Sequence, residues 1–264
     1  MNTRKKATPA SYPGVKFVYS PSPDSVDTNI LILAHGMGDT PENFLNFGKK
    51  MDLPQTAVLA IKAPFPVPYH EGTCWAPVFD AYGNEHPPSS PVIRDSISKT
   101  RKLLADFIHA RILATTTDDD PQRWPARNIF LFGFSQGGAA VVDVALFGPV
   151  GPLGGAVSVS GWPNEASYGG TLPRVNGEVK VLVTQGDGDD VVGEWRKEAA
   201  FLNRVIGTNG SLTTHVVPGK GHSMPMEAGE MRAIMTFFGA HLVLRNLALE
   251  NMADVYQVKK AEKV

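Results

Sequence analysis

Residues 128–140 constrain the fold more than any other stretch of this chain. They read Asn-Ile-Phe-Leu-Phe-Gly-Phe-Ser-Gln-Gly-Gly-Ala-Ala, an apolar run, a serine between glycines and then small residues. G-x-S-x-G is a short pattern that also arises by chance, but here it lies between a predicted buried strand and a predicted helix. In that setting it predicts a nucleophile elbow, a strained turn that lifts the serine hydroxyl clear of a sheet. Gly133 and Gly137 give this turn room, so we predict that Ser135 is placed for chemistry.

Apolar runs alternate with helical patterns along most of the chain. The predicted strands are 15–19 (an edge strand), 29–34, 56–61, the run before Gly133, 153–160, 179–184 and 212–217. The predicted helices are 41–51, 90–114, the segment after the elbow, 194–206 and 226–249. Such alternation predicts an α/β fold with a mostly parallel central sheet and helices on both faces.

Length and composition favour a single domain. The chain has 264 residues, of which 42% are hydrophobic and 19% charged, and no linker divides it. This is enough to bury one substantial core. We expect a mobile N-terminal segment over 1–14, one domain over 15–249 and a charged C-terminal tail over 250–264.

Charge and cysteine content limit which partners and which cellular compartment are expected. The formal net charge is −1, which gives no reason to expect nucleic acid or an anionic membrane as partner and fits a small or acylated substrate. No segment approaches the roughly 20 apolar residues of a transmembrane helix, so stable membrane insertion is not expected. A single cysteine, Cys74, cannot form an intramolecular disulfide and favours a reducing compartment. The basic N-terminus is not followed by an apolar run, so a secretory signal is not expected. We predict a cytoplasmic protein, and the sequence leaves its oligomeric state open.

A reactive serine needs a base that takes its proton near neutral pH, which points to histidine. Of seven histidines, His222 follows the last predicted strand and precedes the last predicted helix. Parallel strands deliver such loops to the edge of the sheet where the elbow lies. His35, at the end of another strand, is expected to brace its loop by hydrogen bonding. The other five lie in predicted helices, a strand or a loop without a second signal, namely His70, His86, His109, His215 and His241.

An acid that orients the histidine is expected in the loop after the strand that ends at Thr184. This loop offers three carboxylates, Asp187, Asp189 and Asp190, and the residues alone do not choose among them. The order serine, acid, histidine along the chain is the order found in α/β-hydrolases.

Residues 63–90 form a long segment rich in proline and aromatic side chains. Long loops of this kind within a compact domain are usually functional or disordered, and the aromatics argue against disorder. Trp75, Phe79 and Tyr82 are expected either to line an apolar wall beside the serine or to form a small core under the loop. Trp162, after the strand 153–160, is assigned to substrate binding with Trp75 and Phe79. The aspartates 118–120 are interpreted as a solvated charge run rather than a metal site.

Five segments together resemble the phospholipase/carboxylesterase family, which includes the acyl-protein thioesterases. They are residues 34–40 (Ala-His-Gly-Met-Gly-Asp-Thr), 133–139 (Gly-Phe-Ser-Gln-Gly-Gly-Ala), 160–162 (Ser-Gly-Trp), 186–189 (Gly-Asp-Gly-Asp) and 221–223 (Gly-His-Ser). The resemblance covers residues 28 to 240 and implies the α/β-hydrolase fold. It places the acid at Asp189 and the oxyanion-hole donors at the backbone N–H groups of Met37 and Gln136.

The acid loop departs from the family's pattern in two ways. The family usually has His-Gly before the aspartates where this chain has Gln185-Gly186, and its D-P-x-V-P is replaced by residues 189–193, Asp-Asp-Val-Val-Gly. The loss of that proline leaves the loop less constrained. Trp75, Phe79 and Asp80 match the family's Trp-Phe-Asp only loosely, so acyl-pocket residues are not transferred.

The sequence predicts a serine carboxylesterase or thioesterase that needs no metal or organic cofactor. Ser135 would be the nucleophile, His222 the base and Asp189 the acid. Two alternatives stay open. One is a hydrolase of a lactone or of a small secondary-metabolite ester, and the other is an α/β-hydrolase domain that binds a ligand without catalysis.

Overall fold

The structure, a computed structural model, describes residues 6–68, 70–114, 122–208 and 210–250. The aspartates 118–120 and the predicted tail beyond residue 250 lie outside these ranges. Within the N-terminal segment, the Lys6 backbone N–H donates to Asp27 Oδ2 at 2.7 Å and the Lys6 side chain donates to the Arg123 carbonyl at 2.8 Å. No described helix is long and apolar enough to cross a membrane.

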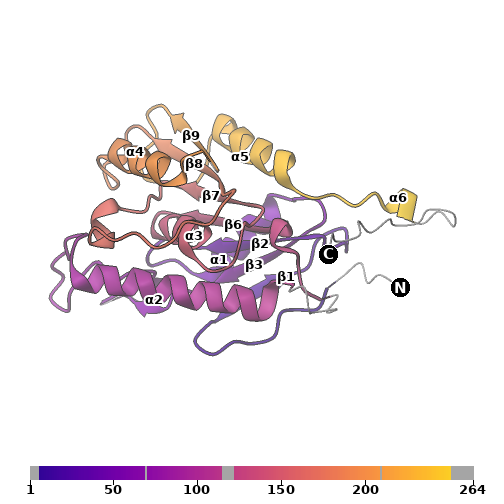
Figure 1. Ribbon diagram of the computed structural model, residues 1–264, viewed down its shortest axis with the longest axis horizontal. Coiled ribbons are helices and arrows are strands. Elements are labelled where there is room, and N and C mark those ends of the chain that lie inside the picture. Colours follow the sequence, from indigo (N-terminus) through magenta and orange to yellow (C-terminus); the bar gives the residue numbers. More distant parts are fainter. Residues whose placement is uncertain (1–5, 69, 115–121, 209, 251–264) are drawn as a thin grey trace, which may run out of the picture.

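A seven-stranded sheet forms the centre of the molecule (Figure 1). Its strands are β1 (Phe17–Ser20), β2 (Asn29–Ala34), β3 (Thr56–Ile61), β6 (Ile129–Phe134), β7 (Gly155–Val159), β8 (Lys180–Gly186) and β9 (Ser211–Val217). They lie in the order β1-β3-β2-β6-β7-β8-β9, and only the edge strand β1 is antiparallel to its neighbour. The mostly parallel sheet expected from the sequence is therefore present.

Helices cover both faces of this sheet (Figure 1). The helices are α1 (Pro41–Lys50), α2 (Pro91–Phe107), α3 (Gln136–Phe147), α4 (Trp195–Ile206), α5 (Ala228–His241) and α6 (Leu247–Glu250), with shorter turns η1 (Ile108–Ile112), η2 (Ala126–Asn128) and η3 (Glu165–Tyr168). Side chains of α2, α3 and α4 share one core cluster with one face of the strands. Those of α1 and α5 share a second cluster with the other face. Because the inner strands are buried on both faces, they read as continuous apolar runs rather than alternating ones.

The closing helix is shorter than predicted. The sequence pattern suggested one helix over 226–249, whereas α5 ends at His241 and α6 follows only after an extended segment. Side chains that lie far away in the sequence hold that segment. Asn29 Nδ2 donates to the Val243 carbonyl at 2.9 Å, and Gln55 Oε1 accepts from the Arg245 N–H at 2.9 Å. These bonds pair the backbone groups of this segment without a helix. Apolar periodicity alone therefore predicted a closing helix that is too long.

The aromatic segment 63–90 carries little regular structure. It contains a two-stranded hairpin of β4 (Phe65–Pro66) and β5 (Thr73–Cys74). The hairpin approaches the loop after β2, because the Gly38 N–H donates to the Thr73 carbonyl at 2.9 Å. The segment therefore packs against the edge of the sheet where the elbow lies.

Candidate active site

Ser135 occupies a strained turn between β6 and α3. Its φ of 54° and ψ of −125° lie in a region that residues other than glycine rarely adopt. The turn closes because two flanking residues lack a Cβ. A Cβ on Gly133 would lie 2.3 Å from the Gly137 carbonyl oxygen, and a Cβ on Gly137 would lie 2.2 Å from the Ala34 carbonyl oxygen. The local sequence thus folds into the elbow geometry that it predicts.

Ser135, His222 and Asp189 lie in hydrogen-bond contact. His222 Nε2 is 2.8 Å from Ser135 Oγ, and His222 Nδ1 is 2.9 Å from Asp189 Oδ2. The strand order explains this meeting, because β6, β8 and β9 deliver the three loops from their carboxyl ends to one edge of the sheet. This chain of contacts is the arrangement in which an imidazole can remove a proton from a hydroxyl while a carboxylate orients it.

The three carboxylates of the acid loop have different surroundings. The Asp189 side chain is fully buried and contacts His222. Asp187 is exposed and its Oδ1 accepts from the Gly219 N–H at 2.6 Å. This bond ties the acid loop to residues 218–223, the histidine loop, which carries His222. Asp190 is exposed. Of the three, only Asp189 contacts the imidazole in the described structure.

Four hydrogen bonds hold the Asp189 carboxylate. Its Oδ1 accepts from the Val191 and Val192 N–H groups, each at 3.1 Å, and its Oδ2 accepts from His222 and from Gln185 Nε2 at 3.1 Å. Burial acts to raise the pKa of this carboxyl, but the bonds from His222, Val192 and Gln185 outweigh burial and lower it below its ordinary value. The carboxylate is therefore ionised at neutral pH. The two backbone bonds also constrain the loop from which the family's proline is missing.

A buried ion pair supports the loop that carries His222. Lys220 Nζ is 2.6 Å from Glu230 Oε1 at the start of α5, and Thr184 Oγ1 at the end of β8 donates to the same oxygen at 2.6 Å. The exposed fractions of the Lys220 and Glu230 side chains are 6% and 0%. This pair links the histidine loop to a strand and a helix.

The loop after β2 is braced by His35, as the sequence suggested. His35 is fully buried, its Nδ1 is 2.7 Å from the Gly36 carbonyl oxygen, and its Nε2 accepts from the Ala63 N–H at 3.1 Å. Burial lowers the pKa of His35, so the ring is neutral and can accept this bond. The Trp75 indole N–H donates to the His35 carbonyl at 2.7 Å and fixes the same loop from the other side.

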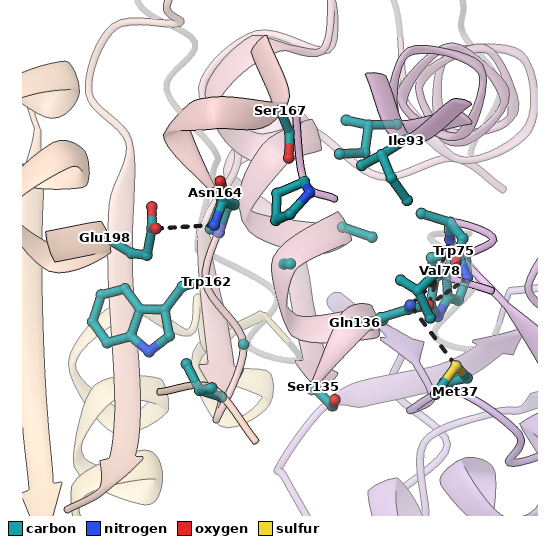
Figure 2. Close-up of a pocket in the computed structure, with 18 of the residues that line it drawn as sticks. Met37, Trp75, Val78, Ile93, Ser135, Gln136, Trp162, Asn164, Ser167 and Glu198 are labelled. Atoms are coloured by element: carbon teal, nitrogen blue, oxygen red, sulfur yellow. Dashed lines mark hydrogen bonds between the residues drawn. The ribbon is translucent and has the colours of Figure 1, made fainter. Parts of the chain in front are cut away.

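Met37 and Gln136 lie on the same side of Ser135 in Figure 2. Met37 lies in the turn after β2, and Gln136 is the first residue of α3, whose first N–H groups have no partner within the helix. The Gln136 side chain contacts the aromatic segment 63–90: it accepts from the Trp75 N–H at 3.1 Å and donates to the Ala76 carbonyl at 3.1 Å. It thereby joins the elbow to the aromatic segment.

A cavity of about 650 Å³ opens beside Ser135. Trp75, Phe79 and Trp162 line it, which is the first of the two roles that the sequence left open for Trp75 and Phe79, and Figure 2 shows Trp162 and Trp75 on opposite sides of the start of α3. Tyr82 was expected with them, but its side chain is 88% exposed and does not line the cavity. The tight turn that places it at the surface is set by bonds to Asp80, whose Oδ1 accepts from the Tyr82 N–H at 2.8 Å.

Sequence reasoning missed a charged group in the cavity wall. Asp143, on α3, lines the cavity and is 4% exposed. Arg101 of α2 binds it through two nitrogens at 2.7 and 3.0 Å, and the Tyr168 hydroxyl donates to it at 2.6 Å. An aspartate inside an otherwise apolar helix was the available signal. No group of three potential metal-binding side chains occurs in the ranges that the structure describes.

Comparison with known proteins places the chain among hydrolases. The family model described as Phospholipase/Carboxylesterase matches residues 16–242. An uncharacterized hydrolase of Mycosarcoma maydis is 33% identical over 150 residues, covering 54% of this chain and 52% of that protein, so the match spans about half of that relative. Carboxylesterase SOBER1 of Arabidopsis thaliana is 28% identical over 201 residues, covering 74% and 83%. Acyl-protein thioesterase 1 of M. maydis is 25% identical over 228 residues, covering 83% and 94%.

Solved structures confirm the fold. The crystal structure of esterase PE8 matches with a TM-score of 0.69 at 21% identity, covering 86% of this chain and 99% of that one. The crystal structure of A. thaliana SOBER1 matches with a TM-score of 0.58 at 22% identity, covering 81% and 98%. The mostly parallel seven-stranded sheet flanked by helices is the α/β-hydrolase fold.

Proposed function

Because the chain belongs to the phospholipase/carboxylesterase family, we propose that it hydrolyses carboxylic esters or thioesters through an acyl-enzyme on Ser135. The observation that carries this proposal is the unbroken set of contacts from Ser135 Oγ through the His222 ring to Asp189 Oδ2, at 2.8 and 2.9 Å. These distances lie within the range required for proton transfer between a nucleophile and its base.

In the first half-reaction, Ser135 Oγ attacks the carbonyl carbon of the substrate. His222 Nε2 takes the hydroxyl proton, and the Asp189 carboxylate stabilises the imidazolium that forms. Collapse of the tetrahedral intermediate breaks the bond to the alcohol or thiol, which leaves with the proton returned by His222. The acyl group is now esterified to Ser135.

In the second half-reaction, His222 removes a proton from water and the resulting hydroxide attacks the acyl-enzyme. Collapse releases the carboxylic acid and returns the proton to Ser135. In both steps the oxyanion would be held by the Met37 and Gln136 N–H groups. Donors of this kind are typically worth about 100- to 1000-fold in turnover each.

Substitution of the serine tests this proposal. We expect Ser135→Ala to lower hydrolysis of p-nitrophenyl butyrate by at least about 10⁴-fold, because no nucleophile remains to form the acyl-enzyme. A fluorophosphonate probe should label the native protein and not the variant, with circular dichroism confirming that both are folded. Native rates in Ser135→Ala would refute the proposal. Failure of the probe to label the folded native protein would instead favour a non-catalytic binding domain.

A further inference from the structure

A buried chain of hydrogen bonds connects the cavity wall to the acid. The Trp162 indole N–H donates to Gln185 Oε1 at 2.7 Å, and Gln185 Nε2 donates to Asp189 Oδ2 at 3.1 Å. This is the oxygen that also contacts His222. Gln185 is fully buried and Trp162 is 6% exposed, so water does not compete with these bonds.

Trp162 and Asp189 together determine which way the Gln185 amide points. An indole nitrogen is only a donor, and an ionised carboxylate is only an acceptor. With the amide reversed, its NH₂ group would face the indole N–H and its oxygen would face the Asp189 carboxylate. Both hydrogen bonds would be lost, because donor would then face donor and acceptor would face acceptor. The second amide hydrogen donates to the Gly186 carbonyl at 2.9 Å, so every polar atom of the Gln185 side chain has a partner.

The same indole ring is fixed by packing. Trp162 stacks on Trp195 at the start of α4, with ring centroids 5.9 Å apart and planes inclined by 20°. One of its faces is therefore occupied, while the ring also lines the cavity. The side chain that forms part of the substrate wall is thus the one that orients the amide beside the acid.

We propose that Gln185 is a positioning residue for catalysis, set by Trp162, which holds the Asp189 carboxylate in the plane that His222 requires. This inference rests on the proposed hydrolytic function. Gln185 is neutral, so it donates to Oδ2 at every pH without adding charge. By sharing Oδ2 with the imidazole, it also limits how strongly the carboxylate stabilises the protonated form of the ring.

Two substitutions remove the two hydrogen bonds that connect Trp162, Gln185 and Asp189. Gln185→Met keeps the length of the side chain without its polar atoms, and Trp162→Phe keeps an aromatic wall without the indole N–H. We expect Gln185→Met to lower kcat for p-nitrophenyl butyrate about 10-fold or more, the effect of losing a hydrogen bond to a charged group. The acidic limb of its kcat/KM profile should move to higher pH, because Oδ2 then interacts with the imidazolium alone.

The double variant shows whether Trp162 acts through Gln185 or whether the two side chains act independently on catalysis. If Trp162 acts through Gln185, the kcat of Trp162→Phe/Gln185→Met should be no lower than that of Gln185→Met, because the indole has nothing left to orient. Trp75→Phe is the matched control, since Trp75 also lines the cavity and also donates its indole N–H, but to His35. Its effect should add to that of Gln185→Met and should leave the acidic limb in place.

A conservative variant guards against loss of folding. Neutral histidine has one donor and one acceptor nitrogen, so Gln185→His should retain most of the native kcat at pH 8, whereas Gln185→Asn is too short to reach both partners and should behave like Gln185→Met. A native kcat and acidic limb in either Gln185→Met or Gln185→Asn would overturn the inference, as would additivity in the double variant. If Ser135→Ala is inactive while these variants behave as the native protein, only the positioning role fails; an active Ser135→Ala would mean that the proposed function fails.

Discussion

At the scale of single residues, three aspartates in one short loop have different environments. Four hydrogen-bond donors surround the Asp189 carboxylate, whereas the Asp187 carboxylate accepts from the Gly219 N–H and Asp190 is exposed. A buried carboxylate with this many donors stays ionised. These surroundings support Asp189 as the acid in the proposed mechanism.

Asparagine substitutions distinguish these positions. We expect Asp189→Asn to lower kcat/KM about 10³- to 10⁴-fold, because the amide stabilises the wrong tautomer of His222 and cannot stabilise its protonated form. Asp190→Asn makes the same chemical change at an exposed neighbouring position, so this control should remain within about 3-fold of the native rate. Rates of ester hydrolysis at saturating and at limiting substrate concentration measure the effect of both substitutions. Equal losses at the two positions would contradict the assignment of the acid.

At the scale of elements, the site depends on the close approach of backbone segments. The turn between β6 and α3 packs against the end of β2, and the end of β8 packs against the histidine loop, where a Cβ on Gly186 would lie 2.0 Å from the Lys220 carbonyl oxygen. Such approaches leave no room for any side chain. The glycines at these points determine whether the three loops can meet.

Alanine at Gly137 should therefore disrupt the elbow. Its Cβ would meet backbone oxygens of Ala34 and His35 at 2.2 and 2.4 Å, which rotation of a side chain cannot relieve. We expect Gly137→Ala to lower the free energy of unfolding by about 3 kcal/mol and to remove most of the esterase activity.

Gly239 on α5 provides the matched control, since a Cβ added there would meet no atom of another element within 4 Å in the described part of the chain. Gly239→Ala should keep activity and raise the free energy of unfolding by up to about 1 kcal/mol, because alanine favours helix. Urea denaturation followed by circular dichroism measures both variants. A Gly137→Ala protein as stable and active as Gly239→Ala would show that the turn tolerates a side chain.

At the scale of the whole molecule, residues of α2, α3 and α4 line the cavity. Near Ser135 its wall is aromatic, but Asp143 enters the wall eight residues further along the helix, about 12 Å at 1.5 Å per residue. Asp143 is neutralised by Arg101 and bound by Tyr168. The cavity wall therefore carries a buried ion pair at this distance from Ser135.

This distribution predicts a limit on acyl length. We expect kcat/KM for p-nitrophenyl esters to rise from acetate to acyl chains of intermediate length and to fall toward palmitate, because a longer chain would place methylenes against the buried ion pair. A series of esters under one set of conditions, with matched thioesters, measures both chain length and leaving group. A continued rise to palmitate would contradict the prediction and indicate a lipid-binding cavity.

Much of this protein was determined by its sequence alone. Continuous apolar runs specified the buried strands, and the glycines around Ser135 specified a turn that only they can form. The alternation of strands and helices predicted that the serine, acid and histidine loops lie at one edge of a parallel sheet. These features are local or periodic, so they can be read without knowing which segments meet.

The tertiary structure decided what depends on distant contacts. It distinguished Asp189 from its neighbours through a histidine 33 residues away, and it ended α5 through bonds between residues 214 and 190 positions apart. It also gave Gln185, which the sequence marked only as a departure, a partner in Trp162 and a place beside the acid. Apolar periodicity and loop composition do not encode these choices, because each one depends on the hydrogen-bond partner that folding brings to the side chain.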